Sequence, residues 1–386
     1  MKVGQVVLRQ PEQMVAGLQS LQTIAPQMLL VFASIDMLHA VAAPLAAAFP
    51  AAIRVGCSTA GEISAEGVSD QSCVVTALHL AKSSVVESST RLADMADSQA
   101  AGRRLSEQLP AAGLKAVLVF GQGVAVNGSA LIQGMADVLG ADIPITGGLA
   151  GDAAAFKETW VLDHTGVHND RLVCVGFYGE SLSYSHGSAG GWSPFGPARR
   201  VTRAAHNVLF ELDGEPALEV YKRYLGDYAK DLPAAGLLFP FAMLGKDHSE
   251  AGLIRTILAT DEALGSLTLA GDIDTDGYLR LMHANTDALV EGAEVAAQAA
   301  KQDAPQAAGQ RADEVAQSLA LLVSCVGRKL VMGGRVEEEI EAVAELFGPS
   351  ALLAGFYSNG EISPLAGTRA CKLHNQTMTI TRIAEL

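Results

Sequence analysis

The chain contains the same turn-like stretch twice. GCSTAGEIS occupies residues 56–64 and GFYSNGEIS occupies residues 355–363, so both copies follow the pattern G-x-x-x-x-G-E-I-S. Each copy also ends the same succession of a short apolar run, a helical stretch and a second apolar run. A repeat of this kind is typical of a duplicated structural unit. We therefore expect two related units, each of which places this turn at the end of a strand.

The runs around the repeat predict a mixed α/β fold. Short apolar segments such as 27–35, 115–123 and 319–327 have strand character, and helical stretches follow them. Because strand–helix–strand patterns build sheets flanked by helices, we expect two related α/β domains. The 386 residues exceed the length at which one core stops growing. A boundary is expected within 200–216, which gives domains at 1–205 and 206–386.

Charge and cysteine content limit the class of protein. The chain has 27 basic and 42 acidic side chains, which argues against nucleic acid or an anionic membrane surface as the main partner. Its apolar runs fall well short of the ~20 residues that a spanning helix needs. The five cysteines include no C-x-x-C pair, which argues against a disulfide framework or a structural zinc. These features predict a cytoplasmic protein without membrane insertion.

The repeated turn offers polar groups at a strand end. Its glycines let the backbone turn sharply and expose amides and hydroxyls. The glutamate of each copy either binds a ligand, with Arg255 or Arg328 as a counter-ion, or accepts hydrogen bonds from its own loop. Both interpretations remain open at this point. The candidate ligand-binding residues are Ser58, Thr59, Glu62, Arg328, Ser358, Glu361 and His374.

Support for an enzyme is weak. The nucleophile pattern G-x-S-x-G fails because Ala60 stands where its second glycine belongs. Cys57 could act as a nucleophile only beside a histidine, and neither His39 nor His79 has a spacing that enforces this. A small buried residue beside a strand end is the simpler interpretation of Cys57. We therefore expect a binding protein without catalytic residues, and a Cys57-dependent hydrolase or transferase is the weakest alternative.

Several longer blocks resemble the FIST family. GCSTAGEI, GGLAGD, ELDGEPALEVYKRYLG, SCVGRKLVMG and GFYSNGEISP occur in the order of the N- and C-terminal halves of that family. FIST domains are intracellular sensory modules, so the resemblance implies a sensor that acts on a signalling protein. One group in the family, NosP, binds haem, senses nitric oxide and regulates a partner histidine kinase. The resemblance therefore implies a partner of this kind, and a homodimer is left open.

A haem cofactor, as the NosP group implies, would be held without a covalent link, because the chain has no C-x-x-C-H motif. A neutral imidazole is the usual axial ligand of haem iron. His186 lies in a glycine-rich segment, and His206 precedes an apolar one, so both are candidate iron ligands. Arginines just before His206 could pair with the haem propionates. These candidate cofactor-binding residues are Arg199, Arg200 and Arg203.

Two hypotheses about the function follow. The first is a cytoplasmic haem-dependent sensor of nitric oxide that regulates a histidine kinase or another signalling protein. The second is a sensor or carrier of a small metabolite such as an amino acid, without haem. In the second hypothesis the charged ends of the metabolite bind to the glutamates of the two turns, Arg328 and His374.

Overall fold

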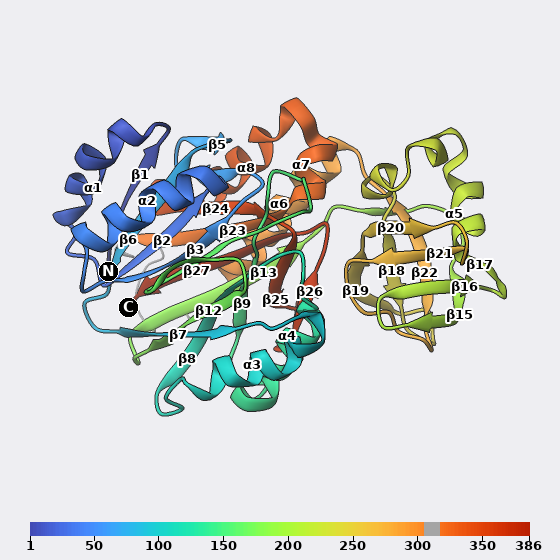
Figure 1. Ribbon diagram of the computed structural model, residues 1–386, viewed down its shortest axis with the longest axis horizontal. Helices are drawn as coiled ribbons and strands as arrows, with labels where there is room; N and C mark the ends of the chain where they lie inside the picture. Colours follow the sequence, from blue (N-terminus) through green and yellow to red (C-terminus); the bar gives the residue numbers. More distant parts are fainter. Residues whose placement is uncertain (305–316) are drawn as a thin grey trace.

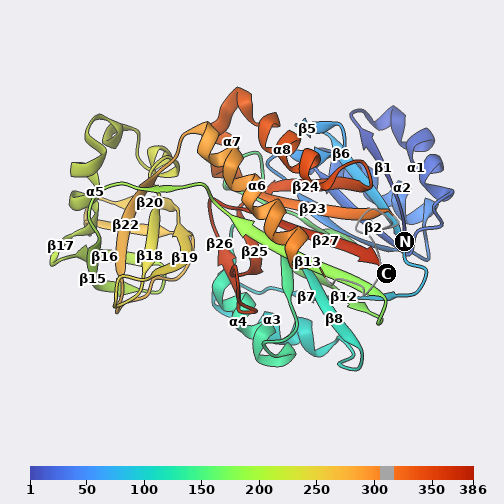
Figure 2. The ribbon, with the colours of Figure 1, turned by 180° about the vertical axis from the view of Figure 1, so that it is seen from behind.

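The chain forms a large body and a smaller domain beside it (Figure 1). The computed structural model describes residues 1–304 and 317–386. The smaller domain extends from β14 (Ser193–Pro194) to β22 (Tyr278–His283). The chain enters it after β13 (Leu182–Ala189) and returns to the body at α6 (Thr286–Gln302) (Figure 2). Two short linkers therefore connect the two parts.

The body begins with a unit of four strands and two helices. Its elements are β1 (Lys2–Leu8), α1 (Met14–Gln22), β2 (Met28–Ala33), α2 (Ile35–Ala48), β3 (Ile53–Ser58) and β6 (Cys73–His79). β2 and β3 are parallel, as the crossover helix α2 between them requires. β6 then lies antiparallel to β2 on its other side, with β1 beyond it at the edge.

The same arrangement occurs twice more. The second unit consists of β7 (Ser84–Arg91), α3 (Ser98–Glu107), β8 (Leu114–Gly121), α4 (Gly128–Leu139), β9 (Ile145–Leu149) and β12 (Arg171–Tyr178). The third consists of β13, α6, β23 (Ser318–Cys325), α7 (Val326–Met332), α8 (Glu337–Phe347), β24 (Ala351–Ser358) and β27 (Met378–Glu385). In both units the strand pairing repeats that of the first. The mixed α/β fold and the internal repeat are confirmed, and the structure adds a third copy.

A glycine marks the same position in all three units. These residues are Gly56, Gly147 and Gly355. Each lies in the parallel strand of its unit, where a side chain would overlap the backbone of the neighbouring strand. The first glycine of the repeated turn is therefore required by the close approach of two strands.

Each unit contributes a hairpin to the sheet of another unit. The hairpins are β4 (Glu62–Ser64) with β5 (Gly67–Ser69), β10 (Val161–Asp163) with β11 (Gly166–His168), and β25 (Gly360–Pro364) with β26 (Cys371–His374). The first unit's hairpin pairs with β24, the second unit's with β3, and the third unit's with β9. This exchange is cyclic, so separating any unit would break main-chain hydrogen bonds of two sheets.

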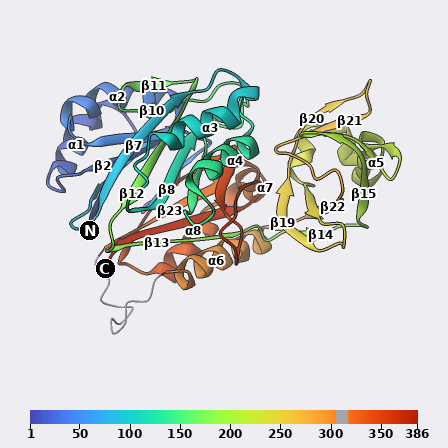
Figure 3. The same ribbon diagram turned by 90° about the horizontal axis from the view of Figure 1, so that it is seen from below.

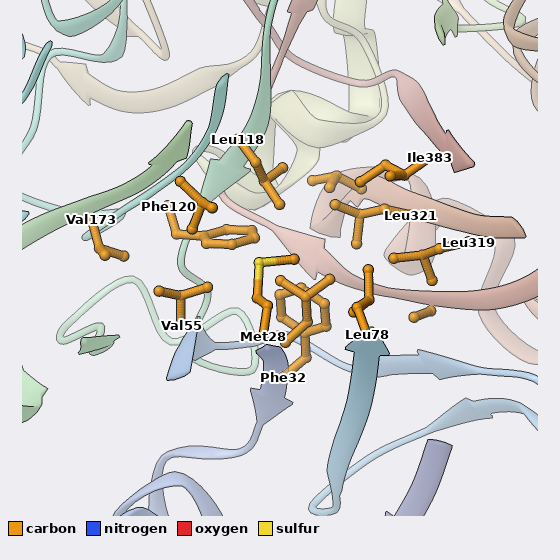
Figure 4. Close-up of a cluster of buried hydrophobic side chains, with 14 of the residues drawn as sticks. Met28, Phe32, Val55, Leu78, Leu118, Phe120, Val173, Leu319, Leu321 and Ile383 are labelled. Atoms are coloured by element: carbon orange, nitrogen blue, oxygen red, sulfur yellow. The ribbon is translucent and has the colours of Figure 1, made fainter. Parts of the chain in front are cut away.

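The three sheets enclose a common apolar core (Figure 4). Leu30 and Phe32 of β2 face this core, whereas Leu29 and Val31 of the same strand face the helices outside. The strands are apolar throughout because both of their faces are buried. The helix pairs α1 with α2, α3 with α4, and α6 with α8 cover the outer faces of the sheets (Figure 3).

The smaller domain is a separate antiparallel sheet with its own core, against which α5 packs. Between β14 and β22 it contains β15 (Arg199–Ala205), β16 (Val208–Leu212), β17 (Glu215–Pro216), α5 (Ala217–Leu225), β18 (Phe241–Leu244), β19 (Glu250–Arg255), β20 (Ile257–Asp261) and β21 (Ser266–Leu269). The boundary expected at 205/206 falls between β15 and β16, which pair with each other. The division in space differs from that expectation, because the segment 193–283 folds as one insertion into the third unit.

Candidate functional site

The first glutamate of the repeated turn is buried among hydrogen-bond donors. Glu62 is 1% exposed, and its Oε1 accepts a hydrogen bond from Thr59 Oγ1 in the same turn. Its Oε2 accepts from the backbone N (3.0 Å) and Oγ (2.7 Å) of Ser72, just before β6. Burial raises the pKa of Glu62, and these hydrogen bonds oppose the shift. The side chain thus joins its own turn to the start of β6.

The second glutamate has the same environment. Glu361 accepts hydrogen bonds from Ser358 Oγ (2.9 Å) and from the backbone N (3.2 Å) and Oγ1 (2.9 Å) of Thr377, just before β27. Its complete burial raises the pKa of the carboxyl group to about 8. Of the two interpretations of the turn, these contacts match the one in which the glutamate accepts hydrogen bonds from its own unit.

The second unit contains the third copy of this turn, in which the glutamate is replaced. β10 pairs with β3 in the same register as β4 pairs with β24 and as β25 pairs with β9. This register places Val161 where the other hairpins have Glu62 and Glu361. The loop before Val161 is also longer, and Asp152 accepts hydrogen bonds from three of its backbone amides. The LAGD segment at 149–152 therefore stabilises a loop.

The three strand-end turns meet at one point, which we call the central junction. It consists of residues 58–61, 149–153 and 357–360. Ala60 N donates to Tyr357 O (2.9 Å), Gly151 N donates to Ser58 O (2.8 Å), and Ser58 Oγ donates to Gly151 O (2.7 Å). A Cβ atom on Gly151 would lie only 2.7 Å from Ala60 N. The junction is filled by backbone, so Ser58 holds units together at a point without room for a ligand.

Arg328 is completely buried and binds both linkers of the smaller domain. Its guanidinium group donates to Glu339 Oε2 (2.8 Å), Gly190 O (2.5 Å) and Leu289 O (2.8 Å). Gly190 lies where the chain leaves for the smaller domain, and Leu289 lies in the first turn of α6, where it returns. The ion pair of Arg328 is with Glu339 and not with a glutamate of the repeated turn.

His374 and Arg255 lie at the interface of the two domains. His374 is 2% exposed, its Nε2 hydrogen-bonds to Ser363 O (3.0 Å), and burial lowers its pKa to about 4. Arg255 of the smaller domain donates to Leu373 O of the body (3.1 Å), and burial lowers its pKa to about 10. Of the residues predicted to bind a metabolite, the structure brings Glu361 and His374 together as partners across β25 and β26. Their side chains hydrogen-bond to different groups, and Arg328 pairs with Glu339 instead.

A cavity of about 690 Å³ lies between the body and the smaller domain. The body contributes Val124 from the loop after β8 and Asn359 from the repeated turn, and the smaller domain contributes Leu232. Several large apolar side chains that are exposed on the protein surface also line it. They are Met95, Phe156, Leu258 and Leu330. Exposed apolar groups around a concave site are typical of ligand binding.

A second cavity of about 900 Å³ adjoins the first and is more polar. Both are lined by Met95, Asn127 and Leu373, and we call the two adjoining cavities together the interdomain cleft. Asn127 Nδ2 donates to Asp272 Oδ1 (3.2 Å) across this cleft, from the N-terminus of α4 to the smaller domain. His206 lines the polar part. Of the two predicted iron ligands, His206 is the one at the cleft.

His186 lies elsewhere. It belongs to β13, its Nε2 is 3.7 Å from Asp303 Oδ2 near the end of α6, and burial lowers its pKa. The predicted arginine rim also differs from the structure. Arg199 pairs with Asp213 (3.1 Å) and Arg203 pairs with Glu211 (2.9 Å), while Arg200 is exposed on the same strand. These arginines form ion pairs within the smaller domain because β15 runs beside acidic segments, and none of them lines the cleft.

The alternative nucleophile is inaccessible. Cys57 is completely buried in β3, and burial raises the pKa of its thiol well above the usual range. Within residues 1–304 and 317–386, no group of three or more histidine, cysteine, aspartate or glutamate residues is placed to hold a metal ion. The helices of these same residues include none long and apolar enough to span a membrane.

Apart from His206 and Arg255, the cleft residues were not predicted from the sequence. They come from distant segments, and single leucines or a methionine in a loop carry no signal of their own. The nearest signal was the apolar run at 236–245, of which Leu237 lines the cleft. This run is too short to span a membrane, and that was the one conclusion drawn from it.

The fold defines an α/β protein with a cleft between two domains. The FIST N domain model matches residues 27–215, and the FIST C domain model matches residues 217–364. The chain belongs to the FIST family, whose domains are sensor domains of signal transduction. The resemblance found in the sequence is thereby confirmed.

Three further proteins are similar to this chain, either over part of its length or at low sequence identity. The chain is 36% identical to uncharacterised protein MJ1623 of Methanocaldococcus jannaschii over 100 residues, which are 25% of this chain and 19% of that protein. It is 26% identical to uncharacterised protein Rv0628c of Mycobacterium tuberculosis over 196 residues, 49% of this chain and 48% of that one. It thus spans half or less of these relatives. The structure of a cyanuric acid hydrolase from A. caulinodans covers 100% of this chain and 98% of its own, at 10% identity and a TM-score of 0.39.

Proposed function

We propose that this protein is a signal-transduction sensor whose ligand binds in the interdomain cleft. The observation that carries the proposal is the apolar cavity of about 690 Å³ between the two domains. Its volume lies in the usual range for small-molecule sites, and its exposed apolar side chains would be covered by a ligand. A ligand in the cleft contacts both domains, so its binding free energy depends on how they are arranged.

A change of domain arrangement provides the output of the sensor. The ligand stabilises the arrangement to which it binds more tightly and so increases its population. The two linkers, held by Arg328, allow the smaller domain to move against a body whose units are joined by hairpin exchange. A histidine kinase or another cytoplasmic signalling protein then recognises one arrangement, as proteins of the NosP group are expected to do.

Haem is the first ligand to test. The apolar cavity and the adjoining imidazole of His206 suit a porphyrin and an axial ligand. Arg199 and Arg203, expected at the propionates, pair with acids instead, and the cations that line the cleft among the described residues are Arg255 and Lys372. When bound, haem would supply an iron that binds nitric oxide. The protein would contribute the imidazole, the apolar walls and the exclusion of water.

Absorption spectroscopy tests this cofactor. Titration of the purified protein with haem should produce a shifted Soret band at one equivalent, and nitric oxide should shift the band again. His206→Ala should abolish the protein-specific band, whereas His186→Ala, outside the cleft, should retain it. A wild-type protein without a Soret shift would contradict the haem assignment, and so would an unchanged spectrum for His206→Ala.

A second measurement tests the cleft without haem. The dye 8-anilinonaphthalene-1-sulfonate becomes fluorescent in apolar sites, and Leu258→Asp places a charge in the apolar wall of the cleft. The substitution should weaken dye binding at least about tenfold, because burying an unpaired carboxylate costs several kcal/mol. The matched control is Leu264→Asp, which changes an exposed leucine of the smaller domain outside the cleft. Equal dye binding by both variants and the wild type would refute the cleft as the ligand site.

A further inference from the structure

A third cavity, of about 490 Å³, lies beside the linker that enters the smaller domain. We call it the linker cavity. Its walls are formed by the linker with Trp192, by β18, β19 and β22 of the smaller domain, and by Leu365 and Thr377 of the body. Its lining has no described residue in common with that of the 690 Å³ cavity, and it shares only Met243 and Leu253 with that of the 900 Å³ cavity. The two spaces are therefore separate places where a molecule could contact both domains.

Arg280 of β22 distinguishes the linker cavity. It lines the cavity, and its Nε atom is buried and has no hydrogen-bond partner among the described residues. By contrast, Lys246, in the loop between β18 and β19, forms an ion pair with Asp276 (2.8 Å). An unsatisfied buried guanidinium nitrogen costs about 1–3 kcal/mol, so an acceptor is expected to come from the cavity itself.

The other polar groups of the cavity favour a ligand of small negative charge. Burial keeps His374 uncharged at neutral pH, with its pKa lowered to about 4, so it adds no second cation. Glu250 lines the opposite edge and is exposed, which disfavours a ligand with several negative charges. Thr368 and Thr377 also line the cavity, but their hydroxyl groups already donate to Leu365 O (3.2 Å) and Glu361 Oε2 (2.9 Å), so the guanidinium group of Arg280 is the donor for a bound oxygen.

The indole of Trp192 provides a flat apolar wall in a fixed position. Its Nε1 donates to Gln376 O (2.8 Å) at the start of the turn before β27. Leu244 and Met282 of the smaller domain supply further apolar surface. A planar ring bound here would contact the indole while its charged end reaches the guanidinium group of Arg280.

We infer that the linker cavity is a second ligand site, which binds a small organic carboxylate with a planar apolar body. A guanidinium group matches a carboxylate with two parallel hydrogen bonds, and this geometry favours carboxylates over other acceptors of the same charge. Because Trp192 belongs to the linker, occupation of the site restrains the segment through which the domains move. Trp192 and Arg280 line this site and neither cavity of the interdomain cleft, so the site stands or falls independently of the proposed function.

Tryptophan fluorescence tests this site directly. The chain has two tryptophans, and Trp160→Phe leaves Trp192 as the single reporter. Titration of this variant with benzoate should give a saturable change of Trp192 fluorescence. Adding Arg280→Gln should weaken benzoate binding at least about tenfold, because a charge-assisted hydrogen bond contributes roughly 1.5–3 kcal/mol. Arg200→Gln, on the same sheet but exposed and outside the cavity, should leave the titration unchanged.

Two further probes separate charge from shape. Benzamide has nearly the shape of benzoate without its charge, so it should give no saturable response with the unaltered Arg280. Arg280→Lys keeps the charge but loses the planar pair of donors, and it should retain only part of the affinity. The inference is overturned if benzoate gives no saturable response, if benzamide binds equally well, or if Arg280→Gln binds benzoate as tightly as the reporter variant.

Discussion

The central junction makes a specific prediction about Gly151. A Cβ atom at this position would lie 2.7 Å from Ala60 N and 3.0 Å from both Thr59 C and Tyr357 O. All three atoms belong to the backbone of other units, so no side-chain rotation can relieve the contact. Gly151→Ala should therefore force the three strand-end turns apart, although the backbone angles of Gly151 themselves suit any residue.

The expected cost follows from two contributions. Extra carbon in a closely packed site costs roughly 1–3 kcal/mol. The displacement also lengthens the hydrogen bonds from Gly151 N to Ser58 O and from Ser58 Oγ to Gly151 O, each of which contributes about 0.5–1.5 kcal/mol. We therefore expect Gly151→Ala to lower the free energy of unfolding of the body by about 2–6 kcal/mol.

Urea unfolding followed by circular dichroism measures this cost. Gly334→Ala is the matched control, because a Cβ atom there meets no atom within 4 Å and the backbone angles are compatible with alanine. The control should leave the body unchanged or stabilise it by about 0.4–1 kcal/mol. If Gly151→Ala unfolds within about 0.5 kcal/mol of the wild type, the junction is not as closely packed as described.

Two further predictions concern buried charge. The pKa of Glu361 is raised from 4.5 to about 8, so its contribution to stability is present below pH 4.5 and is lost as the pH rises to about 8. Glu361→Gln removes this dependence. In thermal unfolding from pH 5 to pH 9, the stability of the wild type should therefore fall relative to that of the variant. Parallel pH profiles of the two proteins would contradict the assignment. Arg328→Met leaves Glu339 buried without its cation and should cost about 3–5 kcal/mol in urea unfolding. The double variant Arg328→Met, Glu339→Gln should recover part of that loss, and no recovery would show that the ion pair is not what Arg328 contributes.

The sequence revealed the α/β unit because its strands are buried on both faces and therefore read as continuous apolar runs. It revealed two of the three copies because Glu62 and Glu361 preserve the same motif. The second unit escaped notice because Val161 replaces the glutamate and the loop before it is longer, although Gly147 keeps the glycine that close strand spacing requires. The second unit thus keeps the same backbone packing as the other two units, although its side-chain pattern differs.

The candidate site was harder to predict for a physical reason. Arg328 lies in α7, directly after β23, and the sequence alone does not show which buried carboxylate will lie beside it. Glu339 does so because α8 packs on the same sheet as α7, which places the two side chains 2.8 Å apart. His206 was identified as a candidate from its sequence neighbours, and it does reach the cleft. Its arginine neighbours do not, because acids within the smaller domain bind them.

The contrast between the body and the smaller domain limits where a sensing motion can occur. Moving one unit of the body would break main-chain pairing in two sheets. The smaller domain is held by two linkers and by a few polar contacts, among them Asn127 to Asp272, Arg255 to Leu373 and Gln376 to Leu237. Three such hydrogen bonds contribute together about 2–5 kcal/mol. A ligand that buries roughly 200 Å² of apolar surface in only one domain arrangement favours that arrangement by about 5 kcal/mol, close to the ~5.5 kcal/mol that reverses a 1:99 equilibrium. One bound molecule therefore has enough free energy to move the smaller domain while the body stays intact.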